Sequence, residues 1–294
     1  MTGPAEPRRP GPSGRRPRDH AHDAGGDPGL LAAKAALRDE VWTRLEEAGV
    51  TRFPGARHRI SNFVGAEAAA ERLRTTSAWL AARTVKANPD SPQWPVRQRA
   101  LEDGKLVYMA VPRLAEPDPF FLLDPDHLAD TPRRASSIKG ASGSARTVPI
   151  AGLEPVDLVV TGCVAVSEDG TRLGKGGGFS DLEAAIAAEA GLLGEHTVVV
   201  TTVHELQVLP AGAIPATDHD VRVDLVVTPD RVLPTTSSGR PPPRIRWEEL
   251  TEDKLAAIPV LRHLAARRGP VTGGRPSTPD DRNGGGDRDD GGRG

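Results

Sequence analysis

The stretch of this chain that is most informative about its fold is Asp169-Gly170-Thr171-Arg172-Leu173-Gly174-Lys175-Gly176-Gly177-Gly178-Phe179-Ser180-Asp181-Leu182-Glu183. It joins a glycine-rich, basic loop to the start of a helix, which the alanine- and leucine-rich run 182–193 continues. The preceding run 156–160 is short and mostly apolar, as in a buried strand. We therefore expect a strand, a loop and a helix in this order.

The loop has the properties of a phosphate-binding site. Ser180 and Glu183 have the spacing of a capping box, which predicts a helix start near Ser180 with its free N–H groups facing the glycines. The positive end of the helix dipole favours anions, and the glycines at 176–178 let the backbone approach a phosphate without a Cβ clash. Arg172 and Lys175 add positive charge. We predict a nucleotide site; a surface turn is the alternative, because Walker A and dinucleotide-binding spacings are both absent.

Length, charge and cysteine content narrow the class of protein. The chain has 294 residues, a formal net charge of −2 and one cysteine, Cys163. The near-neutral charge argues against a surface that coats nucleic acid, and one cysteine excludes an intrachain disulfide. We find neither the apolar segment of a signal peptide nor an apolar run long enough for a membrane span. We expect a cytoplasmic monomer in which the Cys163 thiol is buried and is not a nucleophile.

The ends and the middle of the chain differ in composition. Residues 1–28 and 270–294 are rich in glycine, arginine and aspartate, which predicts disordered tails. Residues 29–235 alternate strand-like and helix-like runs, which favours an α/β domain with a mainly parallel sheet flanked by helices on both faces. A Pro/Ser-rich linker, 236–246, then leads to a helical extension, 247–269. Ligands bind at the carboxyl ends of strands in such folds, where we expect the glycine loop.

Four features occur in a fixed order along the chain. They are Lys34-Ala35-Ala36-Leu37-Arg38 in the first predicted helix, Gly104-Lys105 and Pro112-Arg113 around a strand, the glycine loop 170–181, and His219-Asp220 followed by Val226-Val227-Thr228. Together they resemble the 5-formyltetrahydrofolate cyclo-ligase family, also called methenyltetrahydrofolate synthetase, over about residues 31–233. The loop matches the family signature Gly-x-Arg-Leu-Gly-x-Gly-x-Gly-Tyr-Tyr-Asp except at the two tyrosines.

The resemblance implies an ATP-dependent ligase. ATP would phosphorylate the formyl oxygen of 5-formyltetrahydrofolate, N10 would attack the activated carbon, and phosphate would leave to give 5,10-methenyltetrahydrofolate, with Mg²⁺ bridging the nucleotide phosphates. By position, the ATP-binding residues would be Lys34, Arg38, Arg172, Gly174, Lys175, Gly176, Gly177, Gly178 and Phe179. Arg172 and Lys175 would also act catalytically by stabilising the developing charge, and Asp181 would organise the magnesium shell.

Two departures from the family concern the second substrate. Phe179 and Ser180 stand where the family has two tyrosines beside the folate, and Asp90 stands near the place of its pterin-binding glutamate. These three residues are therefore the candidate substrate-binding residues. The run 174–183, together with 247–250 and 258–261, resembles a divergent cyclo-ligase-like branch, which implies a link to thiamine metabolism.

Other interpretations stay open at this stage. A nucleotide-binding protein that acts on another substrate, or that regulates, would keep the phosphate-binding residues and lose the two tyrosines. A nucleic-acid-associated module would use the arginine-rich arm, and RNA binding by the full chain but not by residues 29–269 would favour it. His204-Glu205 and Asp218-His219-Asp220 lack the His-Glu-x-x-His spacing, which disfavours a transition-metal site.

Overall fold

The computed structural model describes residues 27–217, 220–236 and 243–268. Its strands are β1 (Thr84–Ala87), β2 (Leu106–Ala110), β3 (Phe120–Leu123), β4 (Arg146–Val148), β5 (Leu158–Val160), β6 (Ala165–Ser167), β7 (Arg172–Leu173), β8 (Val198–Thr202), β9 (Val208–Leu209), β10 (Leu225–Val227) and β11 (Val232–Pro234). Eight of these form one sheet in the order β11-β10-β8-β5-β1-β2-β3-β4, and three form a smaller sheet in the order β7-β6-β9.

The large sheet is parallel at its centre and antiparallel at its edges. Strands β10, β8, β5, β1 and β2 pair in parallel, whereas β11 at one edge, and β3 and β4 toward the other edge, join antiparallel to their neighbours. The chain passes from β1 to β2 on one side and later returns to place β5 on the other side of β1. Strand order therefore reverses between β1 and β5, and ligands of open α/β sheets bind at such a point.

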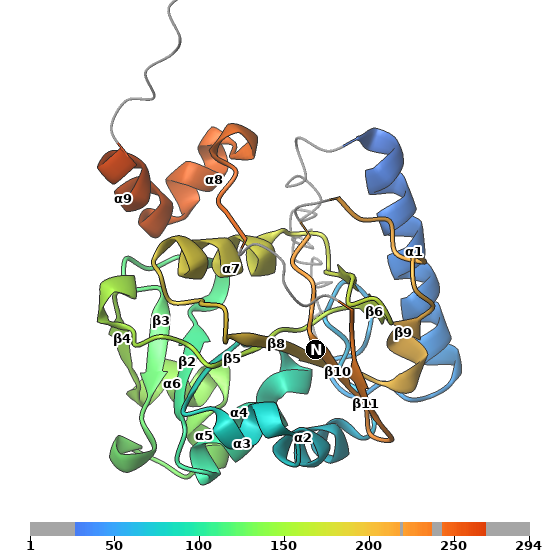
Figure 1. Ribbon diagram of the computed structural model, residues 1–294, viewed down its shortest axis with the longest axis horizontal. Helices are drawn as coiled ribbons and strands as arrows, with labels where there is room; N and C mark the ends of the chain where they lie inside the picture. Colours follow the sequence, from blue (N-terminus) through green and yellow to red (C-terminus); the bar gives the residue numbers. More distant parts are fainter. Residues whose placement is uncertain (1–26, 218–219, 237–242, 269–294) are drawn as a thin grey trace, which may run out of the picture.

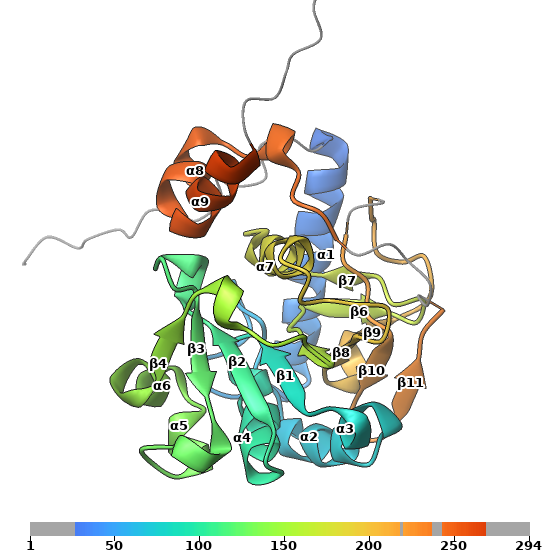
Figure 2. The same cartoon turned by 60° about the vertical axis from the view of Figure 1, so that its left-hand side comes forward.

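Helices cover both faces of the large sheet (Figures 1 and 2). They are α1 (Pro28–Glu47), α2 (Ala66–Arg74), α3 (Ser77–Ala81), α4 (Trp94–Glu102), α5 (Pro132–Ala135), α6 (Ile138–Ser144), α7 (Phe179–Glu189), α8 (Glu252–Ala257) and α9 (Pro259–Arg268). Side chains alternate along each strand, so Met109 packs with Leu73 of α2, whereas its neighbour Tyr108 belongs to the cluster of Ile186 in α7. The predicted mainly parallel sheet with helices on both faces is confirmed.

Two details of the predicted order of elements are wrong. The strand β5 does not lead directly into the glycine loop, because the hairpin of β6 and β7 intervenes and the loop follows β7 of the small sheet. The antiparallel strands β3 and β4 were not expected either. The predicted tails, 1–28 and 270–294, lie almost entirely outside the described residues, and so does much of the predicted linker.

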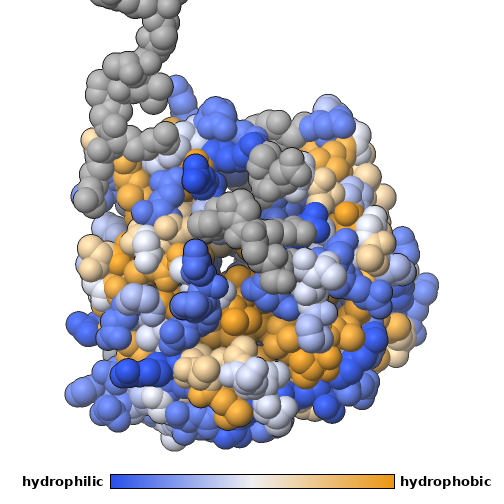
Figure 3. Space-filling view, viewed as in Figure 1, coloured by the Kyte–Doolittle hydropathy of each residue, from blue (hydrophilic) through white to orange (hydrophobic). Residues whose placement is uncertain are grey.

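Viewed from the same direction as Figure 1, the surface shows hydrophilic and hydrophobic residues intermixed (Figure 3). Within the described residues, no helix combines the length and the apolar character that crossing a membrane requires.

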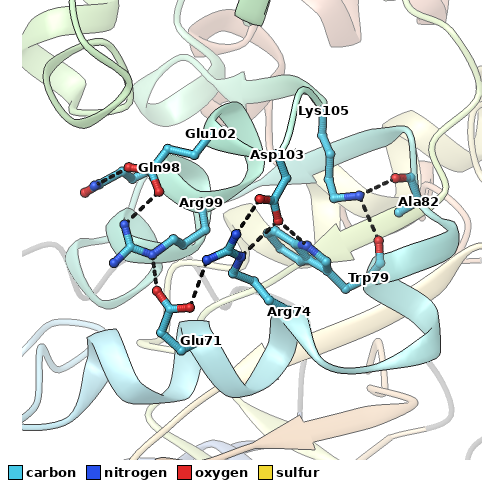
Figure 4. Close-up of polar contacts among 9 residues, drawn as sticks. All are labelled: Glu71, Arg74, Trp79, Ala82, Gln98, Arg99, Glu102, Asp103 and Lys105. Atoms are coloured by element: carbon cyan, nitrogen blue, oxygen red, sulfur yellow. Dashed lines mark hydrogen bonds and ion pairs between the residues drawn. The ribbon is translucent and has the colours of Figure 1, made fainter.

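A polar network joins α2, α3 and α4 (Figure 4). The Asp103 carboxylate accepts hydrogen bonds from Arg74 Nε (2.9 Å) and from the indole Nε1 of Trp79 (2.8 Å). Glu71 bridges Arg74 and Arg99. Partial burial raises the pKa of Asp103, but the hydrogen bonds from Arg74 and Trp79 outweigh it and hold the pKa below 3.8. The ionised form of Asp103 is therefore the one that stabilises the fold.

We expect Asp103→Asn to destabilise the protein by about 1 kcal/mol at pH 7, because a partly exposed charge-assisted interaction is lost. The pKa of Asp103 is lowered in the folded state, so its contribution is complete above pH 3.8 and disappears as the pH falls through the folded value. Urea denaturation of both proteins from pH 7 to pH 3 measures this. Glu102→Gln, which removes the more peripheral partner of Arg99, is the control; an equal loss in both variants would contradict the assignment.

Candidate functional site

The glycine loop ends where α7 begins. Gly178 precedes the helix with a φ of 65°, and Gly176 has a φ of 102°. Both values lie in the left-handed region, where residues with a β-carbon are strained, so glycine is required at both turns. The free N–H groups of the first turn of α7 therefore lie next to three glycines, residues 176–178, which have no side chains to block a ligand. This is the local geometry of an anion-binding loop.

The predicted capping box is wrong. Ser180 lies inside the first turn of α7, and its Oγ accepts a hydrogen bond from Asn88 Nδ2 (2.8 Å) rather than from the helix backbone. Glu183 is buried and forms an ion pair with Lys86 of β1. Burial raises the pKa of Glu183, and the Lys86 charge opposes that rise. Glu183 therefore fixes α7 to the sheet and does not cap the helix.

Helix α1 reaches the loop through Arg38. Arg38 Nε donates to the carbonyl of Gly174 (2.7 Å), and the Arg38 guanidinium carbon lies 3.4 Å from the place that a β-carbon of Gly176 would occupy. One turn earlier on the same helix, Lys34 forms an ion pair with Asp220 (2.9 Å). Residues that are far apart in the sequence thus meet at the loop, as the resemblance implied.

Arg172 lies beneath the loop. Its side chain is only 2% exposed and pairs with Asp181 in the first turn of α7. The Arg172 Nε is buried and has no hydrogen-bond partner among residues 27–217, 220–236 and 243–268. Asp181 is more accessible, with 40% of its side chain exposed, and its Oδ1 also accepts from the backbone N–H of Val221 (3.4 Å). Its Oδ2 has no recorded hydrogen bond to a described residue, so this carboxylate has an oxygen to offer to a cation.

The second part of the site lies at the point where strand order reverses. Asp90 follows β1, and Gly162 follows β5. A β-carbon at Gly162 would lie 2.8 Å from Gln93 Oε1 and 3.2 Å from Asp90 Oδ2, so both oxygens lie close to the backbone of Gly162. Lys175 of the glycine loop is 3.6 Å from the Asp90 carboxylate. The structure therefore places the candidate substrate residue Asp90 beside the candidate ATP loop.

Arg97 of α4 shapes the loop that carries Asp90. Its guanidinium is completely enclosed and donates to the carbonyls of Asn88, Asp90 and Ser136. Burial lowers the pKa of Arg97 to about 10, and the Asp90 charge counteracts the shift. Arg97 thus remains charged at neutral pH and holds the Asp90 segment in place.

The other candidate residues have structural surroundings. Phe179 packs against Gly177, with 3.1 Å from its ring to the β-carbon position, and belongs to the cluster beneath α7. Cys163 is buried beside Thr201, which confirms the predicted burial of its thiol, and burial raises the pKa of this thiol to about 11. His204 caps a short helical turn, whereas Asp218 and His219 lie outside the described residues.

Sequence reasoning missed several members of this site. Asn88, Gln93 and Arg97 became visible only through contacts that the fold makes. Lys86 left a weak signal, because a lysine in the otherwise apolar strand 84–87 requires a buried partner.

Comparisons with known proteins identify the family. The sequence model of the 5-formyltetrahydrofolate cyclo-ligase family matches residues 30–229. This chain belongs to that family. The match covers the chain from β1 to β10, including the glycine loop, and the resemblance to this family is confirmed.

Relatives of this cyclo-ligase family member include two vertebrate proteins called methenyltetrahydrofolate synthase domain-containing protein. The mouse protein (Mus musculus) is 39% identical over 239 residues, which cover 80% of this chain and 64% of that protein. The human protein is 34% identical over 238 residues, which cover 80% of this chain and 62% of that protein. The chain therefore spans somewhat less than two-thirds of the length of these relatives.

Two further proteins that match this chain have names of the cyclo-ligase family. The mitochondrial 5-formyltetrahydrofolate cyclo-ligase of Arabidopsis thaliana is 35% identical over 100 residues, covering 33% of this chain and 35% of that protein. The solved 5,10-methenyltetrahydrofolate synthetase of Aquifex aeolicus is 20% identical, with a TM-score of 0.44, and the match covers 73% of this chain and 98% of that one.

Proposed function

We propose that this protein is an ATP-dependent ligase that converts 5-formyltetrahydrofolate into 5,10-methenyltetrahydrofolate. One observation carries the proposal: a glycine loop at a helix start, together with Arg38, Arg172 and Lys175, lies beside the Asp90 carboxylate at the reversal of strand order. Membership of the cyclo-ligase family supports the same reaction.

The reaction needs positive charge and positioning more than a side-chain nucleophile. The formyl oxygen attacks the terminal phosphorus of ATP, and ADP leaves. N10 then attacks the formyl carbon and loses its proton, and the bond from that carbon to the phosphorylated oxygen breaks to release phosphate. Lys34, Arg38 and the backbone of residues 174–178 would hold the phosphates, while Arg172 and Lys175 would stabilise charge that develops during transfer.

The oxygen atoms around Asp90 suit a ligand that carries several N–H groups. Asn88 Oδ1 and Gln93 Oε1 are buried acceptors without hydrogen-bond partners among the described residues, and the Asp90 carboxylate lies next to Gln93. Buried acceptors without partners are costly, so a bound donor would stabilise them. The aminopyrimidinone part of a reduced folate supplies such donors. Phe179 and Ser180 would flank the same substrate in place of two tyrosines.

A magnesium ion would enter with the nucleotide. Asp181 fits this role, because it is exposed at the loop and has one carboxylate oxygen without a recorded partner among the described residues. Magnesium on nucleotides typically takes one or two protein carboxylates. When bound, it would neutralise negative charge on the nucleotide phosphates.

A second candidate function is nucleotide binding without this ring closure, with another substrate or a regulatory role. The observation that favours it is the hydrogen bond between Ser180 and Asn88, which engages the only hydroxyl left where the family has two tyrosines. A link to thiamine metabolism, as implied for the divergent branch, would be one form of this alternative.

The test uses the purified full chain with Mg-ATP and 5-formyltetrahydrofolate. We expect the absorbance of methenyltetrahydrofolate to rise in step with released phosphate, at one phosphate per product. Reactions without nucleotide and without folate are the controls. ATP binding without product would contradict the ligase assignment and support the second candidate, whereas failure to bind ATP would contradict both.

A further inference from the structure

The C-terminal extension lies over α7 in both ribbon views (Figures 1 and 2). Ile258 and Leu261 are buried in one apolar cluster together with Ile186 of α7. The backbone N–H of Ile245 donates to the carboxylate of Glu189 at the end of α7 (2.9 Å). These contacts fix α8 relative to the glycine loop.

Lys254 of α8 reaches the start of α7. Its Nζ lies 3.6 Å from the position that a β-carbon of Gly178 would occupy. The Thr251 hydroxyl accepts from the backbone N–H of Lys254 (3.2 Å), which fixes the first turn of α8. Among the described residues, no carboxylate is recorded in an ion pair with Lys254, whereas three other lysines, at 34, 86 and 175, each have one.

An independent observation at the same loop points to an anionic ligand. Arg172 is buried just before the loop, and its Nε has no hydrogen-bond partner within the described part of the chain. One of its terminal nitrogens lies 3.9 Å from the β-carbon position of Gly174. Cationic donors therefore approach the glycine loop from below, through Arg172, and from the extension, through Lys254. A buried donor without a partner is costly, and a phosphate oxygen would satisfy it.

We propose that Lys254 is a phosphate-binding residue of this site, supplied by the C-terminal extension, outside the residues 30–229 that match the family. The ligand class is a nucleoside triphosphate or a free polyphosphate, and the inference rests on the nucleotide binding proposed above. A lysine ammonium has three donors and makes strong charge-assisted hydrogen bonds to phosphate oxygens. The extension thereby becomes part of the nucleotide site and not only a cover for α7.

Calorimetric titration of ATP, tripolyphosphate and adenosine into the full chain tests this inference. We expect Lys254→Met to weaken ATP binding about tenfold or more, because one charge-assisted contact is lost. Adenosine binding should not change, since adenosine has no phosphate. Weakening of tripolyphosphate to the same degree would identify the phosphates themselves as the partner, whereas weakening of ATP alone would assign Lys254 to the intact nucleotide.

Two further variants test whether the charge at position 254 itself binds ATP. Lys254→Arg, which retains the charge, should recover much of the ATP affinity, and Arg262→Met, which removes an exposed cation from α9 of the same extension, should leave it within about twofold. An equal thermal midpoint for Lys254→Met and the unaltered protein would show that the extension still packs. If the unaltered chain binds ATP and Lys254→Met binds equally well, the inference is overturned while the proposed function stands; if the unaltered chain binds no ATP, both fall.

Discussion

Arg172→Met is expected to weaken ATP binding by about 10- to 100-fold and to reduce turnover further. Arg172 is buried beneath the glycine loop, and its Nε has no hydrogen-bond partner among the described residues. Removing a charge-assisted contact to a phosphate costs about 1.5–3 kcal/mol, which corresponds to this range of affinity. Contacts that strengthen as charge develops in the transition state would add the further loss in turnover.

Methionine is the appropriate replacement because it fills much of the volume of arginine without its charge. Asp181 would lose its partner, but its exposure to solvent limits the cost to the fold. Arg57→Met is the matched control, since Arg57 is exposed and pairs with Glu46 away from the loop. Titration calorimetry with ATP and the coupled phosphate assay measure both effects. Unchanged ATP affinity in Arg172→Met would show that the phosphates do not lie on this loop.

Lys86→Met is expected to destabilise the protein by about 3–5 kcal/mol at pH 8, because it leaves the Glu183 carboxylate buried without its countercharge. In the variant, burial would raise the pKa of Glu183 further above its unfolded value of 4.5. A group whose pKa is raised on folding favours the folded state at low pH and loses that contribution as the pH rises. The loss should therefore be smaller at pH 5 than at pH 8. Urea denaturation followed by circular dichroism measures it.

The double variant Lys86→Met with Glu183→Leu separates the ion pair from packing. Replacing both partners by apolar residues removes the uncompensated charge, so much of the lost stability should return. Arg52→Met, which breaks an exposed ion pair with Glu67, should change stability by less than about 0.5 kcal/mol. Additive losses in the double variant would contradict a coupled Lys86–Glu183 pair.

Local patterns in the sequence were sufficient to predict the type of fold. The β-branched run of β8 and the glycine-rich loop before α7 carry short-range signals, because strand propensity and left-handed turns depend on residues close in sequence. The antiparallel strands β3 and β4 were missed, since runs of four and three residues are too short to show a strand pattern and these strands are defined by the partners with which they pair.

The roles of charged residues were harder to predict. Glu183 has the spacing of a capping residue, yet it pairs with Lys86, because the tertiary fold buries that face of α7 against β1. A buried carboxylate needs a nearby cation, and the free energy of that ion pair outweighs the weaker interaction of a carboxylate with the start of a helix. The spacing of Ser180 and Glu183 could not reveal that an ion pair competes with helix capping for the Glu183 carboxylate.

The family, the mainly parallel sheet and the glycine loop could be predicted from the amino-acid sequence, because they follow from local periodicity and from an ordered set of short motifs. The proximity of Asp90 to Lys175 and of Lys254 to Gly178 became visible only in the folded chain. Such contacts join segments that are remote in the chain, and they depend on how the sheet reverses its strand order and on where the C-terminal helices pack.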